Sequence, residues 1–201
     1  MITTSARHDI LSRKHWIFDM DGTLTIAKHD FDGIRRELGL PEGLPILESI
    51  AKLPDDEAAV INQRLDEIEL AVAESSEPAE GAASLLENML QQGKKVAILT
   101  RNNAINIEVT LKAAGLSEFF HKDNLLSREC APPKPAPDGI HQLLDVWQGS
   151  INDAVMVGDS IHDLDAGRNA KTATVYYDTK GQFIHKEQAD LCIRHLSELI
   201  G

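Results

Sequence analysis

Two carboxylates separated by one residue follow a short apolar run near the start of the chain. The run ends at Phe18 and is followed by Asp19, Asp21 and Gly22. Side chains alternate along a strand, so the carboxylates start on one side, and the glycine permits a turn that aims both at one reacting group. Carboxylates this close repel each other unless a cation joins them or one stays protonated. The pattern favours a Mg²⁺ site with an acid–base partner, although Asp-x-Asp-Gly is also a common solvated turn.

Four further polar residues follow later apolar runs or stand in loops. They are Thr100, Lys134 within a run of prolines, Asp159 and Asp163. Three of them have a simpler interpretation: the threonine as a helix N-cap, the lysine as a solvated side chain, and Asp159 as part of a turn. The loops at the carboxyl ends of parallel strands converge, however, so residues distant in sequence can share one crevice. The order of these residues along the chain favours a single composite site.

The elements that must position these residues alternate between helix and strand from Pro78 onward. Such alternation predicts an α/β fold, a Rossmann-like doubly wound parallel sheet with helices on both faces. Residues 1–26 and 78–201 are predicted to form this catalytic core. The predicted strands are the run before Asp19, 95–99, a weak strand near 125, 154–157, 173–177 and 191–193; the predicted helices are 82–92, a helix ending near 114, and 138–147.

Residues 27–77 show helix punctuation and no strand pattern. Phe31, Ile34 and Leu38 share one helix face, 45–53 forms a second short helix, and a third begins at Asp55. The third helix carries an apolar stripe at 61, 65, 68 and 72. Each helix of such an insert buries only one face, so the helices must pack together and against a larger part of the protein. We expect a small α-helical cap inserted into the core.

Composition limits the partners and the location of the protein. The 201 residues carry a formal net charge of −12, which argues against nucleic acid and acidic membranes as partners, since both require a basic face. Cys130 and Cys192 lack zinc-ligand spacing and predict neither a disulfide framework nor a structural metal. No signal-peptide or membrane-spanning pattern is present, so a soluble, cytoplasmic protein is expected. The sequence specifies no oligomeric state.

Taken together, these motifs resemble the haloacid dehalogenase-like superfamily, specifically its phosphatases with a small helical cap, such as phosphoglycolate phosphatase. The first motif is matched by Asp19-Met20-Asp21-Gly22-Thr23-Leu24, the second by Thr100, the third by Lys134, and the fourth by Gly158-Asp159-Ser160-Ile161-His162-Asp163. The resemblance covers nearly the whole chain, and the first and fourth motifs are highly specific.

The resemblance implies a role for each matched residue. Asp19 is expected to be the nucleophile and Asp21 the general acid/base. Mg²⁺ is expected to bind the Asp19 and Asp159 carboxylates and the Asp21 backbone carbonyl. Asp163 is expected to contact these ligands without binding the metal itself. The expected phosphate- and substrate-binding residues are Thr100, Arg101 and Lys134.

These roles predict a Mg²⁺-dependent phosphatase that hydrolyses a small phosphorylated metabolite through an aspartyl-phosphate. A sugar-phosphate mutase with the same motifs is an alternative, and so is a non-catalytic regulatory protein on this fold, although such a protein would be expected to have lost Asp19 or Asp159. Two departures from the family pattern are Arg101, where many relatives have Asn, and His162, which we expect to be a solvated loop residue. Neither removes a group that the mechanism needs.

A basic cluster stands out in the predicted cap of this acidic chain. It comprises Lys28, His29, Arg35 and Arg36, with Asp32 placed to face both arginines on one helix. The simpler interpretation is a solvated helix face. The functional alternative is that the surplus positive charge meets a carboxylate or second phosphate at the far end of the substrate.

Overall fold

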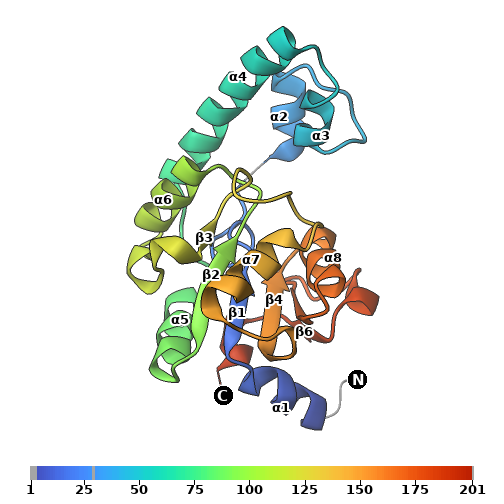
Figure 1. Ribbon diagram of the computed structural model, residues 1–201. Coiled ribbons are helices and arrows are strands. Elements are labelled where there is room, and N and C mark those ends of the chain that lie inside the picture. The colour runs from blue at the N-terminus through green and yellow to red at the C-terminus, as the bar shows by residue number, and fades with distance from the viewer. Residues whose placement is uncertain (1–3, 29, 201) are drawn as a thin grey trace.

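The computed structural model describes residues 4–28 and 30–200, and a six-stranded parallel sheet lies at its centre (Figure 1). The strand order is β3-β2-β1-β4-β5-β6, which confirms the predicted doubly wound α/β fold. The strands are β1 His15–Phe18, β2 Lys95–Leu99, β3 Leu125–Leu126, β4 Ala154–Gly158, β5 Ala173–Tyr177 and β6 Leu191–Ile193. Because β2 and β4 flank β1, the loops that follow these three strands emerge side by side.

Helices cover both faces of the sheet. Trp16 and Phe18 of β1 pack in the hydrophobic cluster that includes α5 and α6, whereas Ile17 packs in the cluster that includes α7 and α8. A strand that is buried on both faces needs a continuous apolar run rather than an alternating one, and β1 has such a run. The helices are α1 Thr4–Ser12, α5 Ala82–Gln91, α6 Ala104–Ala113, α7 Asp138–Trp147 and α8 Ile161–Asn169, with 3₁₀ turns η1 Ser117–Phe119, η2 Lys122–Asn124, η3 Ile151–Asp153, η4 Lys186–Gln188 and η5 Leu196–Leu199.

The local interpretations at two strand ends need correction. The N-cap of α6 is Asn103, whose side chain accepts a hydrogen bond from the Asn106 amide, so Thr100 is not a helix cap. His162 does not lie in a loop, because α8 begins at Ile161 directly after the fourth motif. Neither α8 nor α1 was predicted, since both segments have few apolar residues at helical spacing.

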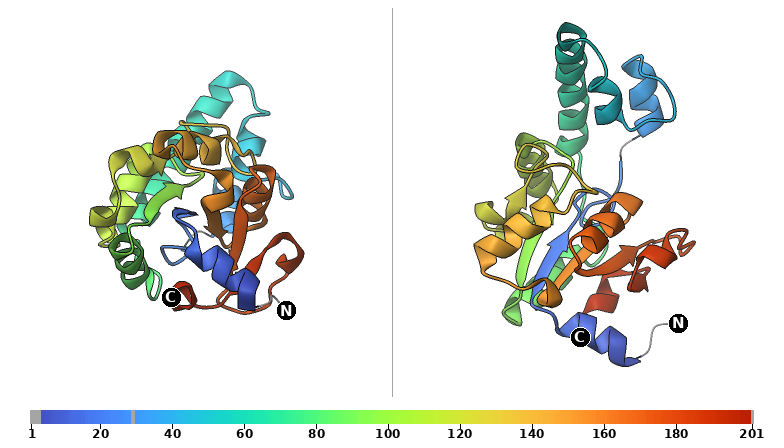
Figure 2. Two further views of the ribbon diagram at one scale, coloured as in Figure 1. Left: turned by 60° about the horizontal axis from the view of Figure 1, so that its bottom comes forward. Right: turned by 45° about the vertical axis from the view of Figure 1, so that its right-hand side comes forward.

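Three helices form a separate group, the helical lobe, at the end of the sheet where the β1 and β2 loops emerge (Figures 1 and 2). They are α2 Phe31–Glu37, α3 Ile46–Ile50 and α4 Asp55–Glu74, and they bury their own hydrophobic cluster of Ile34, Leu38, Leu40, Ile46, Ile50 and Leu65. None of these side chains belongs to the two clusters that pack on the sheet. The lower half of α4 lies beside α6.

The chain enters and leaves the helical lobe at one place. The Ile26 amide donates to the Glu77 carbonyl at 3.0 Å, and the Ala79 amide donates to the Leu24 carbonyl at 2.9 Å. These bonds flank an antiparallel bridge between Thr25 and Pro78. The two connecting segments therefore run as a hydrogen-bonded pair.

Among the helices that the structure describes, none is long and apolar enough to cross a membrane.

Candidate active site

Lys134 joins two buried carboxylates at the carboxyl end of the sheet. Its Nζ donates to Asp19 Oδ1 at 2.5 Å and to Asp163 Oδ1 at 2.6 Å. The lysine is 3% exposed, so its interpretation as a solvated side chain is wrong, and Asp19, at 8%, is not part of a solvated turn. The other oxygen of Asp163 accepts from the amide and the hydroxyl of Ser160 at the start of α8. Asp163 is thereby fixed and in turn holds the ammonium beside Asp19.

Burial and like charge shape the ionisation of this group. Burial raises the pKa of Asp19 well above its ordinary value, although the Lys134 ammonium opposes this shift. Burial, together with the Asp163 carboxylate, raises the pKa of Asp159 to about 7. Burial alone would lower the pKa of Lys134, but Asp163 and Asp19 raise it above its ordinary value. The lysine therefore stays charged, and the surrounding carboxylates have a surplus of negative charge.

The donor set at this point fits a divalent cation. Asp19, Asp159 and Asp163 each offer a carboxylate oxygen, and these oxygens lie within 4.8 Å of one another. Three carboxylates beside one ammonium leave an excess of negative charge that a divalent cation would balance. Oxygen ligands are also those that Mg²⁺ prefers. Of the predicted metal residues, Asp19 and Asp159 belong to this group, whereas the Asp21 side chain does not.

Gly22 allows the first motif to approach Asp159 closely. Its backbone has φ of +90°, and a Cβ at this position would lie 2.3 Å from Asp159 Oδ2. Any larger residue would therefore combine an unfavourable backbone conformation with a clash against a candidate metal ligand. The structure thus gives two physical reasons for a glycine at this turn, the positive φ and the close approach of Asp159.

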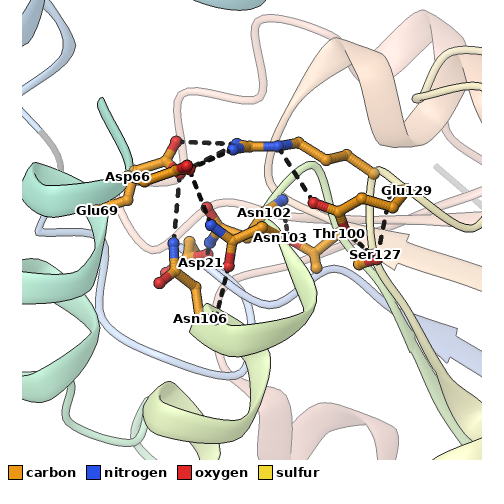
Figure 3. A network of polar contacts seen from close by, with 10 residues as sticks. Asp21, Asp66, Glu69, Thr100, Asn102, Asn103, Asn106, Ser127 and Glu129 are labelled. Carbon is orange, nitrogen blue, oxygen red and sulfur yellow. Dashed lines mark hydrogen bonds and ion pairs between the residues drawn. The ribbon is translucent and has the colours of Figure 1, made fainter. Parts of the chain in front are cut away.

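Asp21 is held by the loop that follows β2. Asn102 Nδ2 donates to Asp21 Oδ2 at 2.6 Å, and the Asn102 amide donates to Thr100 Oγ1 at 3.1 Å. The side chains of Asp21, Asn102 and Thr100 lie together in Figure 3. Asn102 was not among the predicted site residues. Its position two residues after Thr100 in the same loop was the available signal.

All the predicted site residues line one cavity of about 350 Å³. The sheet side contributes Asp19, Asp21, Thr100, Arg101, Lys134, Asp159 and Asp163, and the helical lobe contributes Phe31, Arg35, Pro45, Ile46, Leu47, Leu65 and Glu69. The cavity therefore has a polar wall from the strand ends and a mainly apolar wall from the lobe. His162 also lines it and is half-buried, which corrects its interpretation as a solvated residue.

Glu69 is a cavity residue that the sequence did not single out. It lies one helical turn after Leu65, so a carboxylate follows the apolar stripe of α4 into the cavity. Burial raises its pKa, while Arg128 opposes the shift. Arg128 Nη1 donates to Glu69 at 3.0 Å and Nη2 donates to Asp66 at 2.8 Å. This contact between α4 and the segment after β3 pairs residues that no local pattern connects.

Two asparagines of α6 and its N-terminus extend the same contact (Figure 3). Asn103 Nδ2 donates to Asp66 at 3.0 Å, and Asn106 Nδ2 donates to Glu69 at 3.3 Å. A second polar contact between lobe and sheet is made by Arg101, which donates to Glu48 of α3 at 2.6 Å. Polar side chains thus bridge the two parts at both α4 and α3.

The basic cluster predicted in the lobe is divided in the structure. Arg35 lines the cavity, whereas Lys28 donates to Glu77 at 2.6 Å and to the Ser75 carbonyl on the outer surface. Asp32 pairs with Arg35 at 2.7 Å, and Arg36 is exposed. His29 lies outside the described residues.

The family is shown by sequence similarity. The model of haloacid dehalogenase-like hydrolases matches residues 14–171. An uncharacterized hydrolase from Saccharomyces cerevisiae is 30% identical over 191 residues, which make up 92% of this chain and 88% of the yeast protein. The chain belongs to the haloacid dehalogenase-like hydrolases, as the motifs indicated.

Further relatives share part of the sequence or the fold. Pyrophosphatase PpaX from Halalkalibacterium halodurans is 31% identical over 127 residues, which cover 62% of this chain and 59% of the pyrophosphatase. The crystal structure of a predicted phosphoglycolate phosphatase from Haemophilus somnus superposes with a TM-score of 0.75 at 19% identity, covering 94% of this chain and 97% of that one. The crystal structure of CbbY from Rhodobacter sphaeroides in complex with phosphate superposes with a TM-score of 0.72 at 20% identity, covering 93% of this chain and 96% of that one. The two structural likenesses concern the fold.

Proposed function

We propose that this hydrolase is a Mg²⁺-dependent phosphatase that acts on a small phosphorylated metabolite. The observation that carries the proposal is the position of Asp19, a buried carboxylate held by Lys134 at the base of a cavity that Asp21, Thr100 and Asp159 also line. A nucleophile, a separate acid–base group and cationic charge are the parts that phosphoryl transfer requires.

In the first step an oxygen of Asp19 attacks phosphorus, and the bond from phosphorus to the leaving oxygen breaks. The carboxylic acid of Asp21 gives its proton to that oxygen, so the product alcohol leaves neutral. The Asn102 amide at Asp21 Oδ2 keeps the carboxyl group at one orientation during this transfer. Lys134 and the Thr100 hydroxyl stabilise the charge on the phosphoryl oxygens.

In the second step water hydrolyses the aspartyl-phosphate. The Asp21 carboxylate takes a proton from the water as its oxygen attacks phosphorus, the bond from Asp19 breaks, and phosphate is released. Each proton transfer of this kind contributes about 10²–10⁴-fold in rate. Asp19, Asp159 and the Asp21 backbone carbonyl would hold Mg²⁺, which neutralises phosphoryl charge when bound.

Residues 27–77 are proposed to act as the cap over this site, with 1–26 and 78–201 as the catalytic core. The segregation of buried clusters supports this division, because the lobe buries its own apolar side chains. A cap excludes water from the reacting groups and supplies contacts to the remote part of the substrate. Arg101, held by Glu48 of α3, would then bind substrate at the boundary of the two parts.

The test is release of inorganic phosphate from 4-nitrophenyl phosphate, with Mg²⁺ and with EDTA. We expect turnover with Mg²⁺, loss with EDTA, and loss in Asp19→Asn but not in Asp145→Asn, an exposed control on α7. A panel of phosphorylated metabolites should include inorganic pyrophosphate, in view of the pyrophosphatase relatives. Full turnover in EDTA or in Asp19→Asn would overturn the proposal, and phosphoryl transfer to another hydroxyl without free phosphate would indicate a mutase.

A further inference from the structure

The lobe side of the cavity carries one cation on an apolar wall. Among the described lobe residues that line the cavity, Arg35 is the only base, and most of the other lobe residues in the lining are apolar, among them Phe31, Ile46, Leu47 and Leu65. A phosphoryl group on Asp19 would lie on the opposite, sheet side. The cavity therefore offers a second point of positive charge for the remote end of a substrate.

The Arg35 guanidinium is held in a fixed orientation. Its Nε donates to the Leu44 carbonyl at 3.1 Å, and Nη1 donates to Asp32 Oδ1 at 2.7 Å. Its Nη2 has no hydrogen-bond partner within the described part of the chain. An arginine whose orientation is fixed loses little side-chain entropy when it binds a carboxylate or phosphate through its remaining N–H groups.

Asp32, the acid that pairs with Arg35, is exposed to water outside the cavity and offsets the positive charge of the guanidinium only in part. The Asp32 side chain is 88% exposed and does not line the cavity, so water and salt screen its attraction for the guanidinium. Glu48, the partner of Arg101, is only 43% exposed and neutralises that arginine more effectively. Glu69, the acid on the lobe wall of the cavity, forms its ion pair with Arg128.

We propose that Arg35 selects substrates with a second anionic group, a carboxylate or second phosphate, joined to the transferred phosphoryl group by a short apolar skeleton. This inference rests on the proposed phosphatase function. The remote anion uses binding energy at Arg35 to favour the productive position of the phosphoryl group at Asp19. Arg35 thus acts as a specificity-determining residue, separate from the groups that perform the reaction.

The test compares two alkyl esters of similar size with and without the second charge. The substrates are 2-carboxyethyl phosphate and propyl phosphate, and kcat/KM is measured for each with Mg²⁺. Arg35→Ala should lower kcat/KM for the carboxylate roughly 10- to 100-fold, the range for a hydrogen-bonded charge, and leave propyl phosphate within about threefold. Arg36→Ala removes the same charge from an exposed position of the same helix and should change neither.

A charge reversal makes the test independent of the alanine variant. Wild type should disfavour 3-aminopropyl phosphate relative to propyl phosphate, and Arg35→Glu should reverse that order, while Arg35→Lys should keep much of the wild-type preference. Equal losses on both substrates in Arg35→Ala, or a wild type without preference among the three tails, would overturn the inference while leaving the phosphatase intact. A wild type that hydrolyses neither these esters nor 4-nitrophenyl phosphate would instead refute the proposed function.

Discussion

Replacement of Lys134 by methionine tests how the buried charges of the site are balanced. Methionine has similar length and no charge, so the change removes the ammonium that lies 2.5 Å from Asp19 Oδ1 and 2.6 Å from Asp163 Oδ1. Both carboxylates are almost completely buried. Both carboxylates would lose their cationic partner, and only Asp163 would keep hydrogen bonds from Ser160. The variant should therefore be less stable as well as inactive.

The size of the effect follows from the burial of the three groups. Removing one partner from a buried ion pair costs about 3–5 kcal/mol of unfolding free energy. For a chain of this length each kcal/mol lowers Tm by about 2–4 °C, so the expected loss is about 6–20 °C. Loss of the ammonium raises the pKa of Asp19 further above its unfolded value. The folded variant then binds more protons than the unfolded chain, so its stability increases as pH falls and the deficit narrows toward pH 5.

Thermal unfolding in EDTA at pH 7.5 and pH 5, followed by circular dichroism, measures this difference without a bound cation. Lys112→Met, at an exposed position of α6, is the matched control and should unfold like wild type at both pH values. A Lys134→Met protein within about 1 kcal/mol of wild type at pH 7.5 would show that the ion pairs merely offset the cost of burying them. A deficit that stays constant between the two pH values would show that the carboxylates are not its source.

Three further predictions concern other parts of the site. Asp21→Asn should lower turnover of an alkyl phosphate by about 10²–10⁴-fold with Tm unchanged, because the amide oxygen can still accept from Asn102; near wild-type turnover would remove the acid–base role. Gly22→Ala should lose Mg²⁺-dependent activity through its clash with Asp159, whereas Gly43→Ala, at a similar φ of +87° with open space around it, should incur only the backbone cost; equal effects would exclude the clash as the cause. Arg128→Met should lower the free energy of unfolding by about 1–3 kcal/mol, and by much less in a Glu69→Gln background. A double-mutant cycle measured by urea unfolding tests this difference, and additive effects of the two substitutions would show that the pair is not coupled.

The residues that form the sheet and those that line the polar wall of the cavity could be predicted from the sequence because they obey local rules. The strand before Asp19 is a continuous apolar run, and the first and fourth motifs have fixed spacing, so both the fold and the shared cavity were predicted. Glu69 was missed because its partner Arg128 lies 59 residues away, beyond the reach of any periodicity. The buried state of Lys134 was also hidden, since a lysine among prolines gives no local sign that two carboxylates enclose it. Division of the basic cluster between cavity and outer surface depended on how α2 packs, which composition does not specify.

The paired segments that connect the sheet to the helical lobe make residues 27–77 a self-contained excursion of the chain. Because Thr25 and Pro78 face each other across an antiparallel bridge, the points of departure and return are close enough for a tight turn to join them. The sheet and its two apolar clusters could thus stay unchanged with any insert whose two ends pair in this way. Under the proposed function, one continuous piece of sequence could then be replaced to change substrate preference, while the residues proposed for phosphoryl transfer keep their strands, their order and their neighbours.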